Sequence, residues 1–283
     1  MARKRKTGGR TPRRTRWFRT LIAITACGAA AGGLAAYQTL SDDTTTTERP
    51  VTMEEASRLA LSRLNLYQAS PVAVNLTATE GGGVVVRVRG VVDYRTHRAV
   101  GSYQVTGSTG ASGSSRPSGA SGPVAGQLDH GLIVWDTGGL GLAPAPKGDN
   151  RPAWQQAEHI PRSGWSARSY TTDPLDAGLQ LLIGLGADRP DNPLLLAQSG
   201  ARWLERDRID GRSYDRFAGP RAQGTMPSAG PDGGRSPLTY WIDGDGGLRR
   251  VTMRMSGLGT PTTVEFSGRD GRAKLPEAPW NTR

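Results

Sequence analysis

The chain has 283 residues and a formal net charge of +11, from 36 basic and 25 acidic side chains. Nine of the basic residues fall within residues 1–19, so the other 264 residues carry 27 basic and 25 acidic side chains and are almost neutral. A nearly neutral body argues against a basic groove, so we expect no nucleic-acid partner. The single cysteine, Cys27, excludes an intrachain disulfide and a cysteine-based zinc cluster.

The N-terminal segment has the pattern of a membrane anchor. A basic segment, residues 1–20, precedes an uncharged run over residues 21–37, which would form about 25 Å of helix. That length is at the short end of what crosses a bilayer. Acidic residues follow the run, so the positive-inside rule places the N-terminus in the cytoplasm and the rest of the chain outside. We therefore expect an uncleaved, single-pass anchor in the cell membrane.

Two other interpretations of this segment remain open. Residues 24–27, Ile-Thr-Ala-Cys, fit a bacterial lipoprotein signal in which Cys27 carries the lipid. The apolar stretch before that cysteine is shorter than usual for such a signal, and the residues after it stay apolar. The second alternative is a cleaved signal peptide near residues 35–36.

The body begins with a polar, Thr-rich tether over residues 38–50 and continues as one domain over residues 51–283. Thr52 and Glu55 have the spacing of a capping box, and apolar residues at helical spacing follow to Tyr67, which predicts an amphipathic helix. The apolar period then changes from helical spacing to two, which is typical of an antiparallel meander. The predicted strands of this meander cover residues 72–78, 84–89, 97–106 and 131–136.

The second half of the body mixes helices with further strands. Pro174–Leu185 has leucines at helical spacing, with Asp173 as its expected N-cap, and Pro193–Gln198 predicts a second, shorter helix. Residues 107–128 and 218–236 are rich in Gly, Ser and Pro and are expected to be flexible loops. The remaining predicted strands are 202–209, 212–217, 238–242, 248–255 and 262–266. This order of elements predicts an α+β domain with one large antiparallel sheet.

The residues that could support catalysis do not form a known constellation. Asp243 and Asp245 begin a calcium-loop pattern that fails at its later positions, which favours a hairpin turn. The histidines, His97, His130 and His159, are far apart and have no second ligand at metal spacing. The chain has no G-x-S-x-G hydrolase motif. We therefore expect no enzyme activity, no cofactor and no metal site.

Tryptophan is unusually frequent, with seven Trp against three Phe. Five of them fall near the predicted strands, where they either fill the core of the sheet or form the wall of a cavity for an apolar ligand. The helical segment over residues 174–198 also carries more leucine than a solvent-facing helix pair needs. Both features indicate an apolar surface that must be covered by side chains or by a ligand.

A set of short stretches recurs in one known family. They are the N-terminal membrane address, the helix over 53–67, the strands up to Trp135, Ser163-Gly164-Trp165, Thr172-Asp173-Pro174-Leu175, Leu181-Leu182, Ile209-Asp210-Gly211-Arg212-Ser213-Tyr214, Tyr240-Trp241-Ile242-Asp243 and Leu248-Arg249-Arg250-Val251. In this arrangement the chain resembles, over roughly residues 51–270, the LppX and LprG lipoproteins of actinobacterial envelopes, within the LolA-like class.

The resemblance implies a curved antiparallel half-barrel, with helices on its concave face, that encloses an apolar cavity. Such proteins carry lipids or lipoproteins, so the expected partners are the membrane and a lipid or lipoprotein. An envelope protein is the alternative partner, because RseB-like regulators resemble the same fold and bind envelope signals or partner proteins without a carried ligand. The expected cavity lining is Val86, Val88, Val134, Trp135, Trp165, Leu175, Leu179, Leu182 and Trp241.

Overall fold

The computed structural model describes residues 48–107, 129–220, 236–277 and 279. The predicted anchor over residues 21–37 and nearly all of the two predicted loops lie outside these residues. In the described part of the chain, no helix is both long enough and apolar enough to span a bilayer.

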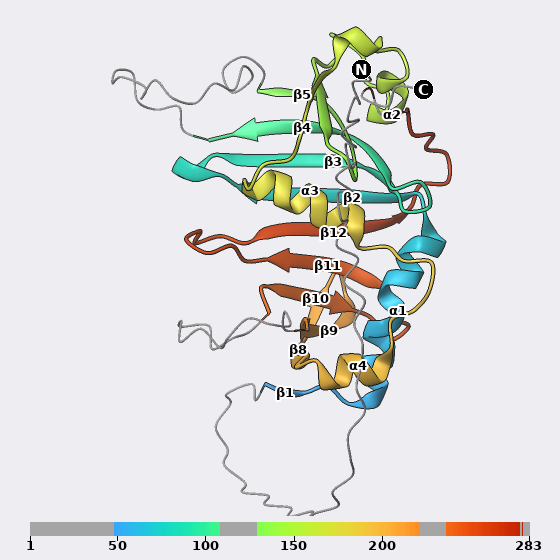
Figure 1. Ribbon diagram of the computed structural model, residues 1–283, viewed down its shortest axis with the longest axis vertical. Coiled ribbons are helices and arrows are strands. Elements are labelled where there is room, and N and C mark those ends of the chain that lie inside the picture. Colours follow the sequence, from blue (N-terminus) through green and yellow to red (C-terminus); the bar gives the residue numbers. More distant parts are fainter. Residues whose placement is uncertain (1–47, 108–128, 221–235, 278, 280–283) are drawn as a thin grey trace, which may run out of the picture. The chain divides into compact units, whose positions relative to one another are not determined.

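The described strands form one open, curved antiparallel sheet of twelve strands (Figure 1). The order across the sheet is β1-β8-β9-β10-β11-β12-β2-β3-β4-β5-β6-β7. The strands are β1 (Arg49–Pro50), β2 (Val72–Thr79), β3 (Val85–Asp93), β4 (Arg98–Thr106), β5 (His130–Asp136), β6 (Leu140–Ala143), β7 (Ser166–Arg168), β8 (Arg202–Ile209), β9 (Arg212–Ala218), β10 (Leu238–Ile242), β11 (Leu248–Met253) and β12 (Thr262–Arg269). The predicted α+β class with one large antiparallel sheet is therefore confirmed.

Four α-helices accompany the sheet in the described residues, and they are α1 (Met53–Ala69), α2 (Ala153–Ala157), α3 (Pro174–Gly184) and α4 (Pro193–Gln198). The predicted capping box at the start of α1 is present. The Thr52 hydroxyl accepts a bond from the Glu55 amide at 3.2 Å, and the Glu55 carboxylate accepts one from the Thr52 amide at 2.8 Å. Arg49 also binds the Glu55 carboxylate through two bonds of 2.7 Å, so the strand before α1 is tied to its first turn.

The two faces of the sheet differ in what covers them. We call the face that carries Val72, Val74 and Leu76 the inner face, and its residues form one large apolar core with α1, α3 and α4. Helix α3 crosses this face over β2 and β12 (Figure 1). The alternate residues form the outer face, where α2 packs on β3 and β4 and makes a small second cluster with Val100 and Val134.

Three elements between residues 137 and 170 were not predicted. These are β6, α2 and β7, and they extend the sheet at the β5 edge and cover part of its outer face. Each is short, between three and five residues, so none contains a full period of apolar residues from which it could be recognised.

Candidate functional site

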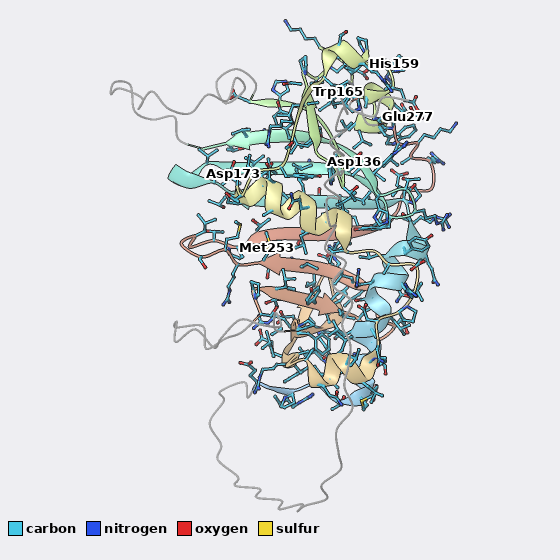
Figure 2. The ribbon with its side chains drawn as sticks, in the orientation of Figure 1. Asp136, His159, Trp165, Asp173, Met253 and Glu277 are labelled. Carbon is cyan, nitrogen blue, oxygen red and sulfur yellow. The ribbon has the colours of Figure 1, made fainter. Side chains whose placement is uncertain are left out.

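The residues predicted to line an apolar cavity do not all lie on one face. Val86, Val88, Trp135, Leu179 and Leu182 belong to the inner side of the sheet, where Leu175 packs at the edge of the core. The other three lie on the outer face. Val134 and Trp165 pack in the second cluster, and Trp241 alternates with core residues along β10. Figure 2 shows Trp165 beside α2, away from the start of α3, which Asp173 marks. The inner and outer residues therefore cannot line a common space.

The interface between α3 and the inner face is tightly packed. Leu179 and Leu182 have exposed fractions of 0%, and Val88, in the same core cluster, is 1% exposed. Helix α3 approaches the sheet at Gly178, where a Cβ atom would lie 2.8 Å from Thr262 Cγ2 and 3.0 Å from Leu76 Cδ1. A side-chain carbon at this position would overlap the sheet, so helix and sheet are in direct contact there.

The start of α3 carries a group of charged side chains. Asp176 is 1% exposed and accepts bonds from both terminal nitrogens of Arg168, at 2.5 and 2.9 Å, and from the Thr171 amide at 2.7 Å. Burial acts to raise the pKa of Asp176, but these bonds outweigh it and hold the pKa below its usual range. The Asp173 side chain makes no cap bond, so the predicted N-cap is correct in position only. Glu80, at the end of β2, instead accepts a bond from the Leu175 amide at 3.0 Å.

Trp241 forms part of a charged row on the outer face. Its ring lies between the guanidinium groups of Arg216 and Arg250, at 5.8 and 5.6 Å from the ring centre, and its Nε1 donates to Asp207 at 2.7 Å. The carboxylates of Glu205 and Glu265 pair with these arginines at 2.5 Å. The charged side chains of this row are paired with one another. Trp241 is buried among them and is not accessible to a ligand.

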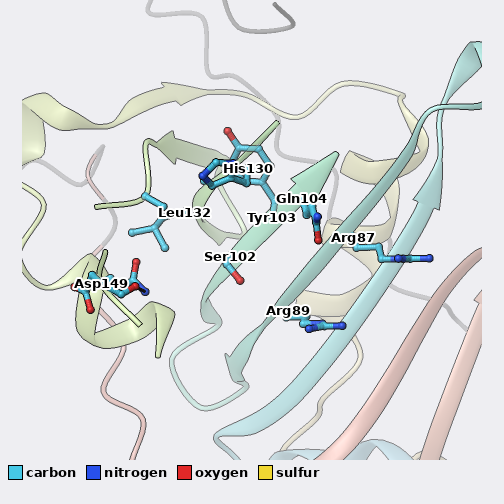
Figure 3. Close-up of a pocket in the computed structure, with 11 residues that line it drawn as sticks. Arg87, Arg89, Ser102, Tyr103, Gln104, His130, Leu132 and Asp149 are labelled. Carbon is cyan, nitrogen blue, oxygen red and sulfur yellow. Dashed lines mark hydrogen bonds between the residues drawn. The ribbon is translucent and has the colours of Figure 1, made fainter. Parts of the chain in front are cut away.

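A pocket of about 350 Å³ lies on the outer face, between β3, β4 and β5 on one side and the segment that leads into α2 on the other (Figure 3). The register of the sheet places Arg87 beside Gln104 and Gln104 beside His130, and in the next row Arg89 lies beside Ser102. The lining residues are Arg87, Arg89, Ser102, Tyr103, Gln104, His130, Gly131, Leu132, Ala145, Asp149 and Gln156.

The charge in this pocket is unbalanced. Arg87 and Arg89 are exposed and have no ion pair or side-chain hydrogen bond among the described residues, whereas Arg206, Arg216 and Arg250 of the same sheet do. Asp149 is the only carboxylate that lines the pocket in the described part of the chain, and Arg151 already neutralises it through bonds of 2.7 to 3.1 Å. These bonds lower the pKa of Asp149 to about 2, so the carboxylate stays charged and stays paired. The pocket therefore presents two unpaired cationic groups.

A second hollow, of about 540 Å³, lies at the turns that join β8 to β9 and β10 to β11. Three of the four charged side chains that line it in the described residues are bonded locally, and Arg212 is exposed without an ion pair. Asp210 pairs with Arg249 at 2.9 Å, and the Asp243 carboxylate accepts bonds from the backbone amides of Asp245 and Gly247. This hollow is explained by the turns that form it, so the candidate site is the pocket at Arg87 and Arg89.

The sequence contains one signal for the pocket. Arg87 and Arg89 alternate with buried valines in a strand, and such a pattern ordinarily marks a solvated face. Two arginines on the same face of one strand are about 7 Å apart and repel each other unless something compensates them. The residues that turn this face into a pocket come from 145–156, whose contact with β4 could not be read from local periodicity.

Comparison with known proteins gives little further information. No protein-family model matches the chain, and no curated protein matches it. Among solved structures, an uncharacterised conserved protein of Thermus thermophilus aligns with 73% of this chain and 81% of its own, at 9% identity and a TM-score of 0.32. A porin-like protein from Bacteroides uniformis aligns with 71% of this chain and 97% of its own, at 10% identity and a TM-score of 0.21.

Proposed function

We propose that this chain is a membrane-anchored binding domain of the bacterial envelope, which recognises its ligand or partner on the outer face of the sheet. This proposal follows the second of the two functions expected from the sequence, a sensing or partner-binding domain without a carried ligand. The observation that carries it is the direct contact between α3 and the inner face at Gly178.

A carried acyl chain needs space between the helices and the sheet. Pockets for small molecules of this size occupy roughly 300–1,000 Å³ and are lined by apolar side chains. The apolar residues predicted to form such a lining under α3 are instead in contact with one another, with exposed fractions of 0% at Leu179 and 1% at Trp135. Opening a cavity there would require α3 to move away from the sheet and to expose its apolar face, which costs about 25 cal/mol for each Å².

The outer face supports recognition at the surface. Helix α2 packs on this face over β3 and β4, and the adjoining rows hold polar side chains that are exposed or half-buried. Arg87 and Arg89 lie in β3, in the interior of the sheet, and neither has an ion pair among the described residues. The location in the envelope rests on the sequence of residues 1–43 and is part of the proposal.

The experiment that tests this proposal asks whether the purified protein holds lipid. Native mass spectrometry of the protein released from membranes should show the mass of the polypeptide alone, and a fluorescent fatty acyl probe should not bind. Leu179→Trp should lower the melting temperature, because it inserts volume into a packed core and costs about 1–3 kcal/mol. Lipid bound at one equivalent, together with a Leu179→Trp variant that melts normally but takes up no probe, would establish the lipid carrier instead.

A further inference from the structure

Helices α1 and α4 carry apolar side chains that the domain itself does not cover. Among the described residues, the large apolar side chains that are exposed are Met53, Leu61, Leu194 and Leu195, with exposed fractions of 49%, 39%, 57% and 47%. All four belong to α1 or α4, which pack against each other. Apolar residues scattered singly over a surface need no explanation, but a group confined to one helix pair indicates an interaction surface. We call these four residues the apolar patch.

The core does not account for the exposed leucines of α4. Leu196 packs against the large core, whereas Leu194 and Leu195 remain about half exposed on the other side of the helix. The solvent side of a surface helix is ordinarily polar. The Asn192 side chain caps this helix by accepting bonds from the Leu194 and Leu195 amides, at 2.9 and 3.4 Å. The two leucines are therefore held in an ordered helix and presented to the outside.

The apolar patch lies close to the point where the chain enters the domain. Strand β1 pairs Pro50 with Arg202, Met53 follows three residues after Pro50, and α4 ends four residues before Arg202. Ten residues, 38–47, separate the predicted anchor from the first described residue. Even fully extended, ten residues span at most about 35 Å. The predicted anchor therefore keeps a bilayer within reach of the patch.

We infer that the apolar patch docks on the surface of the membrane that holds the anchor, with its side chains inserted beneath the lipid headgroups. This inference rests on the membrane anchor of the proposed function, and it adds an orientation for the domain. Apolar helix faces that lie on a membrane insert about 5–10 Å into the boundary between headgroups and acyl chains. A tethered surface acts at an effective concentration that a free partner matches only at about millimolar levels.

Area and charge favour a bilayer over a protein partner. Four partly exposed side chains bury far less than the roughly 800 Å² per partner of a stable dimer, whereas the anchor already supplies the association with a membrane. The charged side chains beside α4 are paired, Arg63 with Asp191 at 3.1 Å and Arg189 with Asp188 at 3.9 Å. They offer no excess charge to an acidic or a basic partner. The docking that we infer is therefore apolar.

Docking at the apolar patch determines how the sheet stands on the membrane. Strands β8, β9, β10, β11, β12 and β2 lie between β1 and β3, and α2 packs on β3 and β4. Figure 1 shows β1 and α4 at one end of the sheet and α2 towards the other. The β1 edge then faces the bilayer. The exposed Glu158, at the end of α2, lies away from it.

The test places a polarity-sensitive dye on the full chain in lipid nanodiscs that hold one chain each. In a Cys27→Ser background, Leu194→Cys or Glu158→Cys is labelled with nitrobenzoxadiazole, and the discs contain doxyl-labelled phosphatidylcholine, which quenches a dye that reaches the acyl boundary. We expect several-fold stronger quenching at position 194 than at position 158, which controls for the affinity of the dye itself for lipid. Raising NaCl or adding phosphatidylglycerol should leave the quenching unchanged, because the docking does not depend on charge.

A second variant separates the patch from the tether. Met53→Gln combined with Leu195→Gln should reduce the quenching at position 194 several-fold and leave the melting temperature unchanged, because both side chains are exposed in the folded domain. Quenching at position 194 that is no stronger than at position 158, or that persists in this double variant, overturns the inference. A shift of the dye emission to shorter wavelength without quenching by lipid overturns it in favour of contact with a second copy of the chain.

The same samples separate this inference from the proposed function. A chain that does not remain in the nanodiscs contradicts the anchor, and the proposed function then fails together with the docking. A chain that remains in the discs with an unquenched dye at position 194 contradicts the docking alone.

Discussion

Asp215 is a buried carboxylate of the inner face that accepts hydrogen bonds from three side chains. Its side chain is 2% exposed and accepts bonds from Arg58 at 2.6 Å, from Trp203 Nε1 at 3.1 Å and from Arg206 Nε at 3.0 Å. Burial acts to raise the pKa of Asp215, and the bonds from Arg206, Trp203 and Arg58 outweigh it, so the pKa lies below its usual range. These bonds join α1 to β8 and β9 through one residue.

We predict that Asp215→Asn destabilises the domain by about 3 kcal/mol at pH 7, because it leaves the half-buried Arg58 without its counter-ion. The pKa of Asp215 is lower in the folded than in the unfolded state. Its contribution to stability is therefore present above about pH 4 and is lost as the pH falls further. Urea unfolding from pH 7 to pH 3 should show the gap between wild type and variant becoming smaller. Asp245→Asn, at an exposed turn, should leave the curve unchanged, and a constant gap at all pH values would contradict the prediction.

Glu80 should show the opposite dependence on pH. Burial raises its pKa, and the nearby carboxylates of Asp173 and Asp176 raise it further, although the bond from the Leu175 amide acts against them. A raised pKa means that the folded state binds the proton more tightly, so this contribution to stability is lost as the pH rises through the folded pKa.

We predict that Glu80→Gln is at least as stable as the wild type at pH 7, because the amide oxygen still accepts the Leu175 N–H and no charge is buried. The advantage of the variant should disappear near pH 4, where the wild-type carboxyl is protonated. Thermal melting across this range measures it, with the exposed Glu158→Gln as control. A marked loss of stability at pH 7 would show that the ionised carboxylate is needed at the start of α3.

At the scale of elements, helix α3 contains two glycines in different surroundings. Gly178 faces the sheet, where a Cβ would lie 2.8 Å from Thr262, whereas a Cβ at Gly184 would meet nothing within 4 Å. Alanine favours a helix interior over glycine by about 1 kcal/mol, and by less at Gly184, which is the last residue of α3. A loss of stability on adding a Cβ at Gly178 therefore reports on the packing under α3.

We predict that Gly184→Ala raises the free energy of unfolding by up to about 1 kcal/mol. Gly178→Ala should lower it by a similar amount or more, because overpacking costs about 1–3 kcal/mol and exceeds the gain in helix propensity. Chemical denaturation of the two variants decides this. If both changes stabilise the domain equally, α3 can move away from the sheet at little cost, and a cavity can form beneath it.

The elements that the sequence predicts correctly are those formed by interactions between residues close together in the chain. The capping box at Thr52 and the alternation of β2 depend on neighbours a few residues apart, and both occur within about two residues of the predicted limits. The sequence predicts Asp173 as the N-cap of α3, and Asp173 holds that position, but the Leu175 amide donates to the Glu80 carboxylate, 95 residues away in the chain. No local pattern contains that contact.

At the scale of the whole molecule, the sequence predicts one large antiparallel sheet, but it does not show which residues of different strands share a face of that sheet. Alternation divides each strand into two sets of residues, yet which sets of different strands share a face depends on register and on bulges such as the one at Trp241 and Ile242. The sequence therefore predicts one lining for Trp241, Val134 and Leu179, although the sheet separates the first two from the third. The pocket needed the same information, since Gln156 and Arg87 line one pocket only because α2 packs on the outer face.

Membrane attachment is the remaining whole-molecule prediction, and it belongs to residues 21–37, outside the described part of the chain. We predict one uncleaved anchor, because an uncharged run of about the length of a bilayer lies between nine basic residues and an acidic segment. Intact mass of the protein extracted from membranes should match residues 1–283 with or without the initiator methionine. Cys27→Ser should remain in the membrane fraction after carbonate washing. A mature chain that begins at a lipid-modified Cys27, and a Cys27→Ser variant that is released or unprocessed, would establish a lipoprotein instead.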